Sequence, residues 1–396
     1  MFRNCKATMA LTMNTLAFTV CFACWMLNGV LVTFLVENQI FAWSDAQIGW
    51  VIGAPVLSGA LFRLPAGILT DKYGGKYVFS VVMLLAAIPM YLLSFADSYW
   101  SFFFCSLAFG VVGASFAVGI AYTAVWFKPE NQGTALGVFG AGNAGAALTS
   151  MGAPFLLTYL TNGGENVEAW RTMPRLYAGI LLVMTVVFWL GTTHKKADDS
   201  HINSLRERLA PLRYPRVWRF GLYYFLLFGG FVALAQWLIP YYVNAYMMSL
   251  AMAGLMAAIF SLPSGVIRAL GGYMSDRMGA RRVMYGVLGT CLVASALLIV
   301  PRMAVESPGK GIMAKRSGTV TQVHVDAIVV NDVRYALRPT DEKTLRDARE
   351  SEAFLILPSR TMGQKPVVKV GDAVEKKQLL AQGVTKIYFQ ANVWIF

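Results

Sequence analysis

The chain has 396 residues, of which 57% are hydrophobic and 14% are charged, and its formal net charge is +13. Apolar stretches of about 20 residues recur along it, long enough to cross a hydrocarbon layer of roughly 30 Å. The basic residues lie mostly in short connections between these stretches rather than on one soluble face, so a nucleic-acid partner is not expected. The composition instead predicts a multi-pass protein embedded in a lipid bilayer.

Nine stretches have the length and composition of membrane-spanning helices. The first follows MFRNCK and is far longer than the apolar region of a secretory signal, so we expect it to remain as a helix. A tenth span is expected to start at Ile387. The nine predicted spans are Met9–Val36, Gln47–Thr70, Tyr77–Phe95, Tyr99–Phe127, Thr134–Leu160, Leu176–Gly191, Trp218–Val243, Leu250–Ser275 and Val283–Val300.

Lysine and arginine residues gather in alternate connections, most densely between His194 and Arg219. The positive-inside rule places these connections, and with them the N-terminus, in the cytoplasm. The connections on the other side hold fewer of them, although Arg171 and Arg175 weaken the contrast. We therefore expect a bacterial inner (plasma) membrane protein with a cytoplasmic N-terminus.

The long basic connection divides the spans into two sets that repeat each other. Six spans precede it, which predicts a six-helix bundle over residues 1–193, a cytoplasmic linker over 194–217 and the start of a second bundle over 218–301. A set of arginine, glycine, aspartate and basic residues in and just after the second span recurs in and just after the eighth, 205 residues later and at the same spacing. They are Arg63, Gly67, Asp71, Lys72, Gly74 and Lys76 in the first copy, and Arg268, Gly272, Asp276, Arg277, Gly279 and Arg281 in the second.

The pattern G-x-x-x-D-[RK]-x-G-x-[RK], at the cytoplasmic ends of a second and an eighth span, resembles the signature loop of the major facilitator superfamily. The resemblance implies two six-helix bundles with a substrate site between them near the membrane midplane. The chain then holds about nine and a half of twelve helices, either as a fragment or as a truncated product. From the residues themselves, the aspartate can cap or pair at a helix end, the glycines permit a tight turn, and the basic residues bind the cytoplasmic face. The expected gating residues are Gly67, Asp71, Lys72, Gly74, Gly272, Asp276, Arg277 and Gly279.

Residues 302–384 differ from the rest of the chain, because they are rich in charged residues and contain runs in which apolar and polar residues alternate as in β-strands. GTVTQVHVDAIVV, VRYAL and AFLILP predict strands, with a turn at Asn331 and a short helical or loop piece from Asp341 to Glu352. Since the ninth span leaves the cytoplasm, we expect a β-rich soluble insert on the periplasmic side, followed by the start of a tenth helix in 385–396. The stretch PVVKVGDAVEKKQLLAQG resembles the barrel-sandwich strands of lipoyl and biotinyl carriers. No modifiable lysine accompanies it in a carrier-like setting, so a structural or regulatory role is favoured.

Arg63 and Arg268 are the only charges inside the predicted spans, away from their ends. Arg63 is about 12 Å from the helix end at Asp71, at 1.5 Å per residue. An arginine at such depth costs on the order of 2.5–3.5 kcal/mol on insertion scales. Because these spans offer no acidic partner, we expect the counter-charge to be a planar oxyanion, which suits the guanidinium fork. Snorkelling and stacking on aromatic rings are the alternative interpretations.

The fifth span, GTALGVFGAGNAGAALTSMGAP, carries small residues that allow close helix packing. Asn143 lies in their midst, and an amide in hydrocarbon needs a hydrogen-bond partner on a neighbouring helix or a ligand. Together with the arginines, this run resembles the nitrate signature of the NarK-type nitrate/nitrite porters. A second such signature, expected in an eleventh helix, falls beyond the end of the chain.

The resemblance implies that Arg63 and Arg268 clamp the anion and that Asn143 and Gly140 line the cavity. The aromatic residues that line the cavity in that family correspond to Phe116, Tyr224 and Phe228. The tyrosine hydroxyl can donate a hydrogen bond to the anion, and the two phenylalanine rings can sandwich it. Core packing is the alternative role for these three aromatic residues.

The predicted function is transport of nitrate and nitrite by alternating access, in a monomer without cofactor or metal. No nucleotide-binding loop, metal-ligand cluster or activated nucleophile suggests an enzyme. Because the spans hold no titratable carboxylate or histidine, nitrate/nitrite antiport is preferred over proton-coupled nitrate uptake. The alternatives are a facilitator for another small anion and an inactive truncated carrier whose β insert is a sensor or assembly module.

Overall fold

The computed structural model describes residues 5–196, 207, 209–246, 248–297, 302–339, 341–351 and 359–390. Its contacts divide the chain into two compact units, a helical unit (Met1–Pro240 and Ala253–Val283) and a β unit (Tyr241–Met252 and Met284–Phe396). The domain boundaries drawn from the sequence repeat stay a prediction. Residues 197–206 and 208 of the predicted linker lie outside the described part of the chain.

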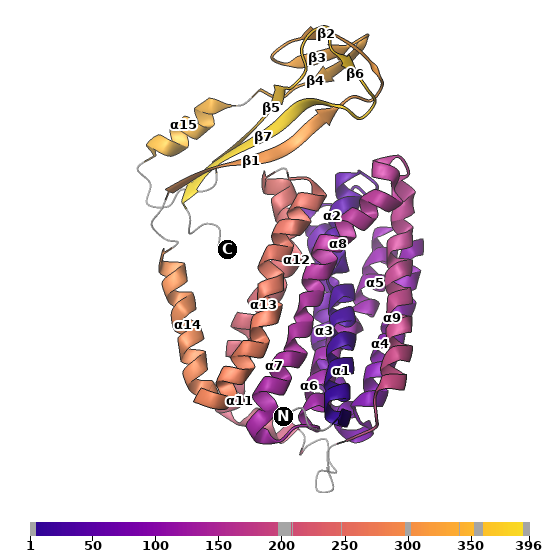
Figure 1. The fold of residues 1–396 in the computed structure, drawn as a ribbon, viewed down its shortest axis with the longest axis vertical. Helices are drawn as coiled ribbons and strands as arrows, with labels where there is room; N and C mark the ends of the chain where they lie inside the picture. Colours follow the sequence, from indigo (N-terminus) through magenta and orange to yellow (C-terminus); the bar gives the residue numbers. More distant parts are fainter. Residues whose placement is uncertain are drawn as a thin grey trace. The chain divides into compact units, whose positions relative to one another are not determined.

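Long apolar helices, lying side by side in Figure 1, make up the helical unit. Among the described residues, seven helical stretches are long and apolar enough to cross a membrane. The fifth predicted span is helical too, and the ninth is helical as far as Leu297, where the description of this stretch ends. Glycine, serine and threonine lower the hydropathy of the fifth span, and Arg281 and Arg282 lower that of α14, which begins before the ninth span. The helices of the chain are α1 (Cys5–Trp25), α2 (Leu27–Glu37), α3 (Asp45–Tyr73), α4 (Gly75–Leu92), α5 (Tyr99–Phe109), α6 (Ser115–Ala124), α7 (Gln132–Gly140), α8 (Gly145–Leu160), α9 (Thr172–Gly191), α11 (Pro215–Tyr224), α12 (Gly230–Tyr246), α13 (Leu250–Met278), α14 (Ala280–Leu297) and α15 (Glu342–Glu350).

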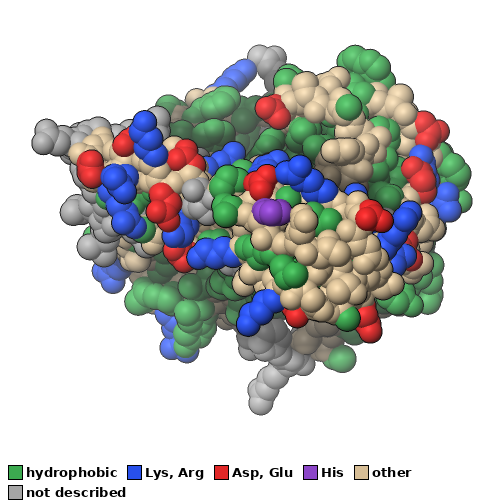
Figure 2. Space-filling model, turned by 90° about the horizontal axis from the view of Figure 1, so that it is seen from above, with side chains coloured by type: hydrophobic (Ala, Val, Ile, Leu, Met, Phe, Trp, Pro, Cys, Tyr) green, Lys and Arg blue, Asp and Glu red, His purple; other side chains and the backbone are tan. Residues whose placement is uncertain are grey.

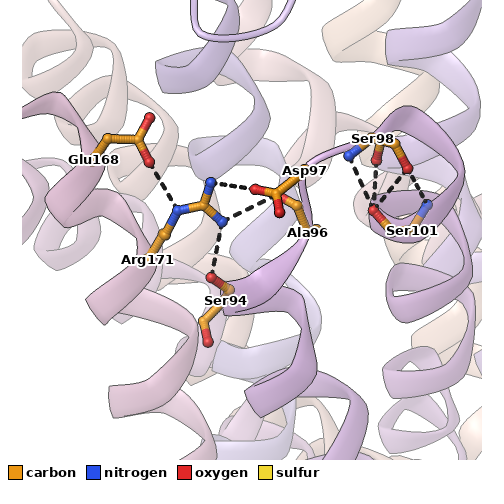
Figure 3. Close-up of polar contacts among 7 residues, drawn as sticks. All are labelled: Ser94, Ala96, Asp97, Ser98, Ser101, Glu168 and Arg171. Carbon is orange, nitrogen blue, oxygen red and sulfur yellow. Dashed lines mark hydrogen bonds and ion pairs between the residues drawn. The ribbon is translucent and has the colours of Figure 1, made fainter.

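Helix caps and short irregular segments determine where the spans begin and bend. The Ser44 hydroxyl accepts a hydrogen bond from the Gln47 backbone N–H, and the Gln47 side chain accepts one from the Ser44 backbone, so a capping box begins α3. Ser98 and Ser101 form the same box before α5 (Figure 3). The irregular segments are the 3₁₀ turns η1 (Leu93–Phe95), η2 (Gly110–Ala114), η3 (Pro129–Asn131), η4 (Ala141–Ala144), η5 (Asn162–Gly164), η6 (Val167–Arg171) and η7 (Ala210–Arg213), and the π-helical segment η8 (Phe225–Gly229).

Helix α1 is central to the packing of the helical unit, because it contacts α6, α7, α8 and α9. Its Phe18, Cys21 and Trp25 side chains are almost wholly buried. Large apolar side chains such as Leu61 and Trp100 are instead more than half exposed. Such an outward apolar surface suits helices that face lipid rather than water.

Arg171, at the end of η6, ties the start of α9 to the connection between α4 and α5 (Figure 3). Its guanidinium lies 2.6 Å from Asp97 Oδ1 and 2.8 Å from Glu168 Oε2. It also donates hydrogen bonds to the backbone carbonyls of Ser94 and Ala96. The arginine side chain is 25% exposed and the Asp97 side chain 79% exposed. The carbonyl contacts are therefore the more sheltered part of the cluster.

Two antiparallel sheets form most of the β unit, in the strand orders β1-β7-β5 and β4-β3-β2-β6. Strands β2 to β4 and helix α15 confirm the predicted runs, and the turn at Asn331 has a positive φ of 50°, which asparagine tolerates. The predicted AFLILP strand lies outside the described residues. The strands are β1 (Arg302–Met313), β2 (Gly318–Val323), β3 (Ala327–Val330), β4 (Val333–Ala336), β5 (Ser359–Pro366), β6 (Ala373–Val374) and β7 (Leu379–Gln390).

The prediction that a tenth helix starts at Ile387 is wrong for the described residues, because this residue lies in β7 and pairs with β1 and β5. Thr385 and Ile387 are buried, whereas Lys386 and Tyr388 are half-buried, and this two-residue alternation is that of a strand. The pairing register with β1 runs through the same residues. The apolar run IYF has the length of a buried strand rather than that of a membrane span. Residues 391–396 lie outside the described part.

The β unit has its own apolar core, which includes Val320, Ile328 and Leu380. Asp341 caps α15 by accepting hydrogen bonds from Lys343 and Thr344, and the bond from the Thr344 hydroxyl lowers the pKa of the Asp341 carboxyl. Figure 2 shows lysine and arginine side chains interspersed with acidic ones on the face that it presents. No single sign of charge dominates that face.

Replacing Arg171 by alanine is expected to lower the free energy of unfolding by about 1–3 kcal/mol, because two backbone carbonyls and two carboxylates lose a charged donor. Asp97→Asn is the matched change at the exposed end of the same cluster and should cost less than about 1 kcal/mol. Thermal unfolding of both purified variants in one detergent measures the difference. Equal losses would show that the exposed ion pair, not the carbonyl contacts, holds this corner.

Candidate functional site

Arg63, midway along α3, is surrounded by aromatic rings. Its Nε donates a hydrogen bond of 3.4 Å to the Gly113 carbonyl in η2. Its Cζ lies 5.2 Å from the centroid of Phe228, 5.5 Å from that of Phe116 and 5.6 Å from that of Trp25. A cation over a ring face is attracted by the ring quadrupole, most strongly where water is excluded. Among the described residues, no ion pair involves this guanidinium.

Arg268, at the corresponding position of α13, shares the Phe228 ring with Arg63. Its Cζ lies 5.3 Å from the Phe228 centroid and 5.6 Å from that of Phe231. Its Nε is buried and has no hydrogen-bond partner in the part of the chain that the structure describes. A Cβ at Gly140 would come within 3.2 Å of the Arg268 side chain, so glycine leaves room for the arginine stem. Both charges thus converge on one ring.

Three aromatic rings stack beside these guanidiniums. The Phe228 centroid lies 5.3 Å from that of Phe116, with the planes at 18°, and 4.8 Å from that of Tyr224. An anion between two rings needs about 3.5 Å to each, roughly 7 Å in all. The gap between Phe116 and Phe228 is therefore closed to an anion in this conformation. A sandwich of the expected kind requires these two rings to part.

Asn143 lies in η4 and is fully buried. Neither its Nδ2 nor its Oδ1 has a hydrogen-bond partner among the described residues. The adjacent glycines pack against α1, since a Cβ at Gly142 would come within 2.6 Å of Phe18 and one at Gly145 would overlap the Thr19 carbonyl. Leaving a buried amide unpaired is costly, and most such groups in proteins have a partner. The amide is therefore a buried polar group that the described residues leave unsatisfied.

Each arginine lines a cavity. One of about 810 Å³ is bounded mostly by apolar side chains of α3 and α12, and one of about 340 Å³ lies between α6, α7 and α13. Six of the seven predicted substrate-site residues line one or the other, and Asn143 lines neither. Arg63, Tyr224 and Phe228 line the larger cavity, and Phe116, Gly140 and Arg268 line the smaller.

The two copies of the signature loop adopt the same backbone conformation. Gly74 and Gly279 have φ values of 87° and 89°, in a region that glycine occupies without strain. In the second copy, Asp276 accepts hydrogen bonds from the backbone N–H groups of Gly133 and Thr134, at 2.9 and 2.7 Å, and from the Thr134 hydroxyl at 2.6 Å. A carboxylate is favoured at such a helix N-terminus. Asp276 therefore joins the end of α13 to the start of α7.

The other predicted loop residues lie at the same helix ends. Lys72 stacks on its neighbour Tyr73 at 5.1 Å, and Arg277 lies 5.2 Å from the ring of Tyr273. Asp71 lies in the last turn of α3. Gly67 faces open space, whereas Gly272 packs directly on α7.

Sequence reasoning missed three neighbours of the arginines, namely Trp25, Phe231 and the carbonyl of Gly113. Phe231 had a signal in the sequence, because it lies three residues after Phe228 and so on the same helix face. Trp25 and Gly113 had none, because their contacts with Arg63 depend on how α1 and η2 cross α3.

Residues 13–314 match the family model described as Major Facilitator Superfamily. A protein of Thermus thermophilus named "Probable nitrate/nitrite antiporter NarK1" is 44% identical over 297 residues, which are 74% of this chain and 66% of that relative. A "Probable nitrate/nitrite transporter NarK2" of Mycobacterium tuberculosis (strain ATCC 25618 / H37Rv) is 32% identical over 295 residues, 74% of this chain and 72% of the relative.

Among solved structures, a bacterial homolog to the human lysosomal transporter Spinster, in an inward-facing and occupied conformation, is similar with a TM-score of 0.53. The sequences are 19% identical, and the similarity covers 70% of this chain and 63% of that one, so it bears on the fold alone. The chain spans just under two thirds of the length of the Thermus relative and of this structure.

Gly272 and Gly271 provide a matched test of helix packing beside the site. A Cβ at Gly272 would overlap the Gly133 carbonyl, whereas one at Gly271 meets no described atom within 4 Å. Gly272→Ala is therefore expected to cost about 1–3 kcal/mol through overpacking, and Gly271→Ala should leave stability unchanged or slightly raised. Thermal unfolding measures both. A Gly272→Ala variant as stable as Gly271→Ala would contradict the close approach of α7 and α13.

Proposed function

The chain belongs to the major facilitator superfamily and, within it, to the NarK-type nitrate/nitrite porter family, and we propose that it transports nitrate and nitrite across a bacterial plasma membrane. Both named relatives carry nitrate and nitrite in their names. The helical unit supports a membrane location, because seven of its described helical stretches are long and apolar enough to span one.

The observation that carries the proposal is the pair of guanidiniums converging on Phe228. Arg63 and Arg268 lie 5.2 and 5.3 Å from that ring, and neither is paired with a carboxylate among the described residues. Two positive charges in an apolar site repel each other, and this repulsion grows as the effective dielectric constant falls. An anion between them relieves both the repulsion and the desolvation of each arginine. The missing negative charge is the substrate.

The shape of the donors favours a small planar oxyanion. Each guanidinium is a rigid planar fork of N–H donors that matches two oxygens of one anion. The Asn143 amide of η4 has no partner among the described residues and lines neither cavity, so it would supply a further donor only when the site opens, and ring faces above and below would hold a flat anion in its plane. Nitrate and nitrite both meet these requirements. Entry of either requires Phe116 and Phe228 to separate from their present stacking distance.

The hydrogen bonds of Asp276 support a two-state mechanism, in which the site is closed on one side of the membrane while it is open on the other. These three hydrogen bonds link α13 of the second repeat to α7 of the first, so they exist only while these two ends meet. By the positive-inside rule, the basic residues of the loops favour a cytoplasmic location for these ends. In this mechanism Asp276 stabilises the state that is closed toward the cytoplasm, and the bundles rock about the arginine pair.

Exchange of nitrate for nitrite is the preferred mode of coupling. Proton symport normally needs a titratable relay in the membrane, and the predicted spans carry no carboxylate or histidine away from their ends. An exchanger needs only that the loaded site crosses more readily than the empty one. An anion that cancels one of the two arginine charges supplies that difference. We further propose a monomer with a cytoplasmic N-terminus and a periplasmic β insert.

Replacing either Arg63 or Arg268 by lysine is expected to weaken nitrate binding at least tenfold, about 1.4 kcal/mol. Lysine keeps the charge but loses the planar fork that meets two oxygens. Calorimetric titration of the purified protein with nitrate, nitrite, formate and chloride measures the affinity and the preference for planar oxyanions.

Arg175→Lys is the control for that change. Arg175 is also hydrogen-bonded, to Ser94 Oγ at 3.0 Å, and also lies over a ring, Phe95, at 5.0 Å, but it lines neither cavity. Its variant should bind nitrate as the parent does. If all three lysine variants bind nitrate equally, the paired arginines are not the anion site.

Antiport predicts that uptake of ¹⁵N-nitrate into vesicles containing the protein requires nitrite or nitrate inside. Collapsing a pH gradient with a protonophore should change the initial rate less than twofold. Measuring uptake with loaded and empty vesicles, with and without an inward proton gradient, separates the modes. Uptake into empty vesicles that follows the proton gradient would establish symport instead.

A further inference from the structure

The β unit holds a cavity of its own, separate from the residues of the anion site. Its volume is about 450 Å³, within the range of small-molecule pockets. It lies between one face of the β1-β7-β5 sheet and the segment that follows β4. The lining residues are Gly309, Ile312, Ala336, Leu337, Arg338, Met362, Gly363, Gln364, Gly383, Val384 and Thr385.

The floor of this cavity is a trough created by the register of the sheet. Gly309 of β1 pairs with Gly383 of β7, and Gly383 pairs in turn with Gln364 of β5. Residues directly opposite each other in neighbouring strands share a face, as do residues two apart in one strand. Thr385 and its partner Met362 therefore point to the same face as the two glycines. Paired glycines in neighbouring strands mark a place where another group approaches the sheet backbone.

Thr385 places a polar group in this trough without a partner. The residue is 0% exposed, and its Oγ1 has no hydrogen-bond partner among the described residues. A Cβ at Gly309 would come within 2.9 Å of that oxygen, so the glycine also keeps space open beside the hydroxyl. Because buried hydroxyls are normally hydrogen-bonded, a ligand that enters the cavity would satisfy this one.

Arg338 is the one charged residue among the described residues that line the cavity. Its backbone is held in place, since its N–H donates to Gln364 Oε1 at 3.2 Å and its carbonyl accepts from the Gln364 N–H at 2.9 Å. Ile312, Leu337 and Met362 make most of the remaining wall apolar. The site thus offers one cation, one buried hydroxyl and an apolar surface.

We propose that this cavity binds a small organic carboxylate with an apolar body. The carboxylate pairs with Arg338, the apolar body lies along the glycine trough, and a polar atom of the ligand meets the Thr385 hydroxyl. Such a site goes beyond anion transport, because it lies in the β unit and uses none of the residues of the arginine pair.

The test uses 4-(trifluoromethyl)benzoate as the probe and ¹⁹F line broadening, measured on the full chain in lipid nanodiscs, as the readout of binding. We expect saturable binding that Arg338→Gln and Thr385→Val each weaken about five- to tenfold and that Ala336→Trp, which fills the cavity, abolishes. The uncharged probe 4-(trifluoromethyl)benzamide should bind at least fivefold more weakly than the acid.

Thr361→Val is the matched control. Thr361 is also buried in the same sheet with an unpartnered hydroxyl, but it pairs with Lys386 and so belongs to the opposite face. This variant should bind the probe as the parent does, and it separates the loss of a cavity group from the general cost of altering the sheet. Absence of saturable binding, or equal binding by the parent, Thr385→Val and Ala336→Trp, would overturn the proposal.

Discussion

Two half-buried arginines among aromatic rings, with no carboxylate paired to either in the described residues, form the constraint on which the helical unit depends. A guanidinium far from either membrane surface is tolerated only where a cavity, a ring face or a carbonyl offsets its lost hydration. Arg63 has a cavity, ring faces and a carbonyl around it: it lines the larger cavity, lies near the rings of Trp25, Phe116 and Phe228, and donates a hydrogen bond to the carbonyl of η2. These contacts stabilise the cation without neutralising it. The site therefore keeps a net positive charge that an anion can satisfy.

Irregular helix segments carry two of the groups that contact Arg63, and a third such segment carries Asn143. The Gly113 carbonyl belongs to η2, Asn143 to η4 and Phe228 to η8. Short 3₁₀ and π segments inside α-helices redirect backbone groups and side chains, and they are frequent at functional sites. Small residues next to these segments allow the helices to touch, with Gly140 beside the Arg268 stem and Gly145 against α1. Close packing and irregular geometry thus serve the same end, which is to bring polar groups into an apolar interior.

Much of this arrangement could be predicted from the sequence, because it follows from local rules. Membrane helices follow from the length of apolar runs, and the repeat at 205 residues located both arginines and two loops whose glycines share one conformation. The contacts of Trp25 and Gly113 could not be predicted, since they depend on crossing angles between helices. The same holds for the closed stack of Phe116 and Phe228, which is a property of one conformational state. The strand at Ile387 could not be predicted either, because a short apolar run fits both a strand and a helix until its pairing partner is known.

The central claim is that Arg63 and Arg268 bind one and the same anion, and a double-mutant cycle on nitrate affinity tests it most directly. The parent, Arg63→Lys, Arg268→Lys and the double variant would each be titrated with nitrate by calorimetry at one ionic strength. If both forks hold a single anion, the losses are coupled by about 1 kcal/mol or more, within the range found for residues that share a partner. Losses that add within about 0.3 kcal/mol would mean that the two arginines act at separate sites, and the account of a shared anion would be wrong.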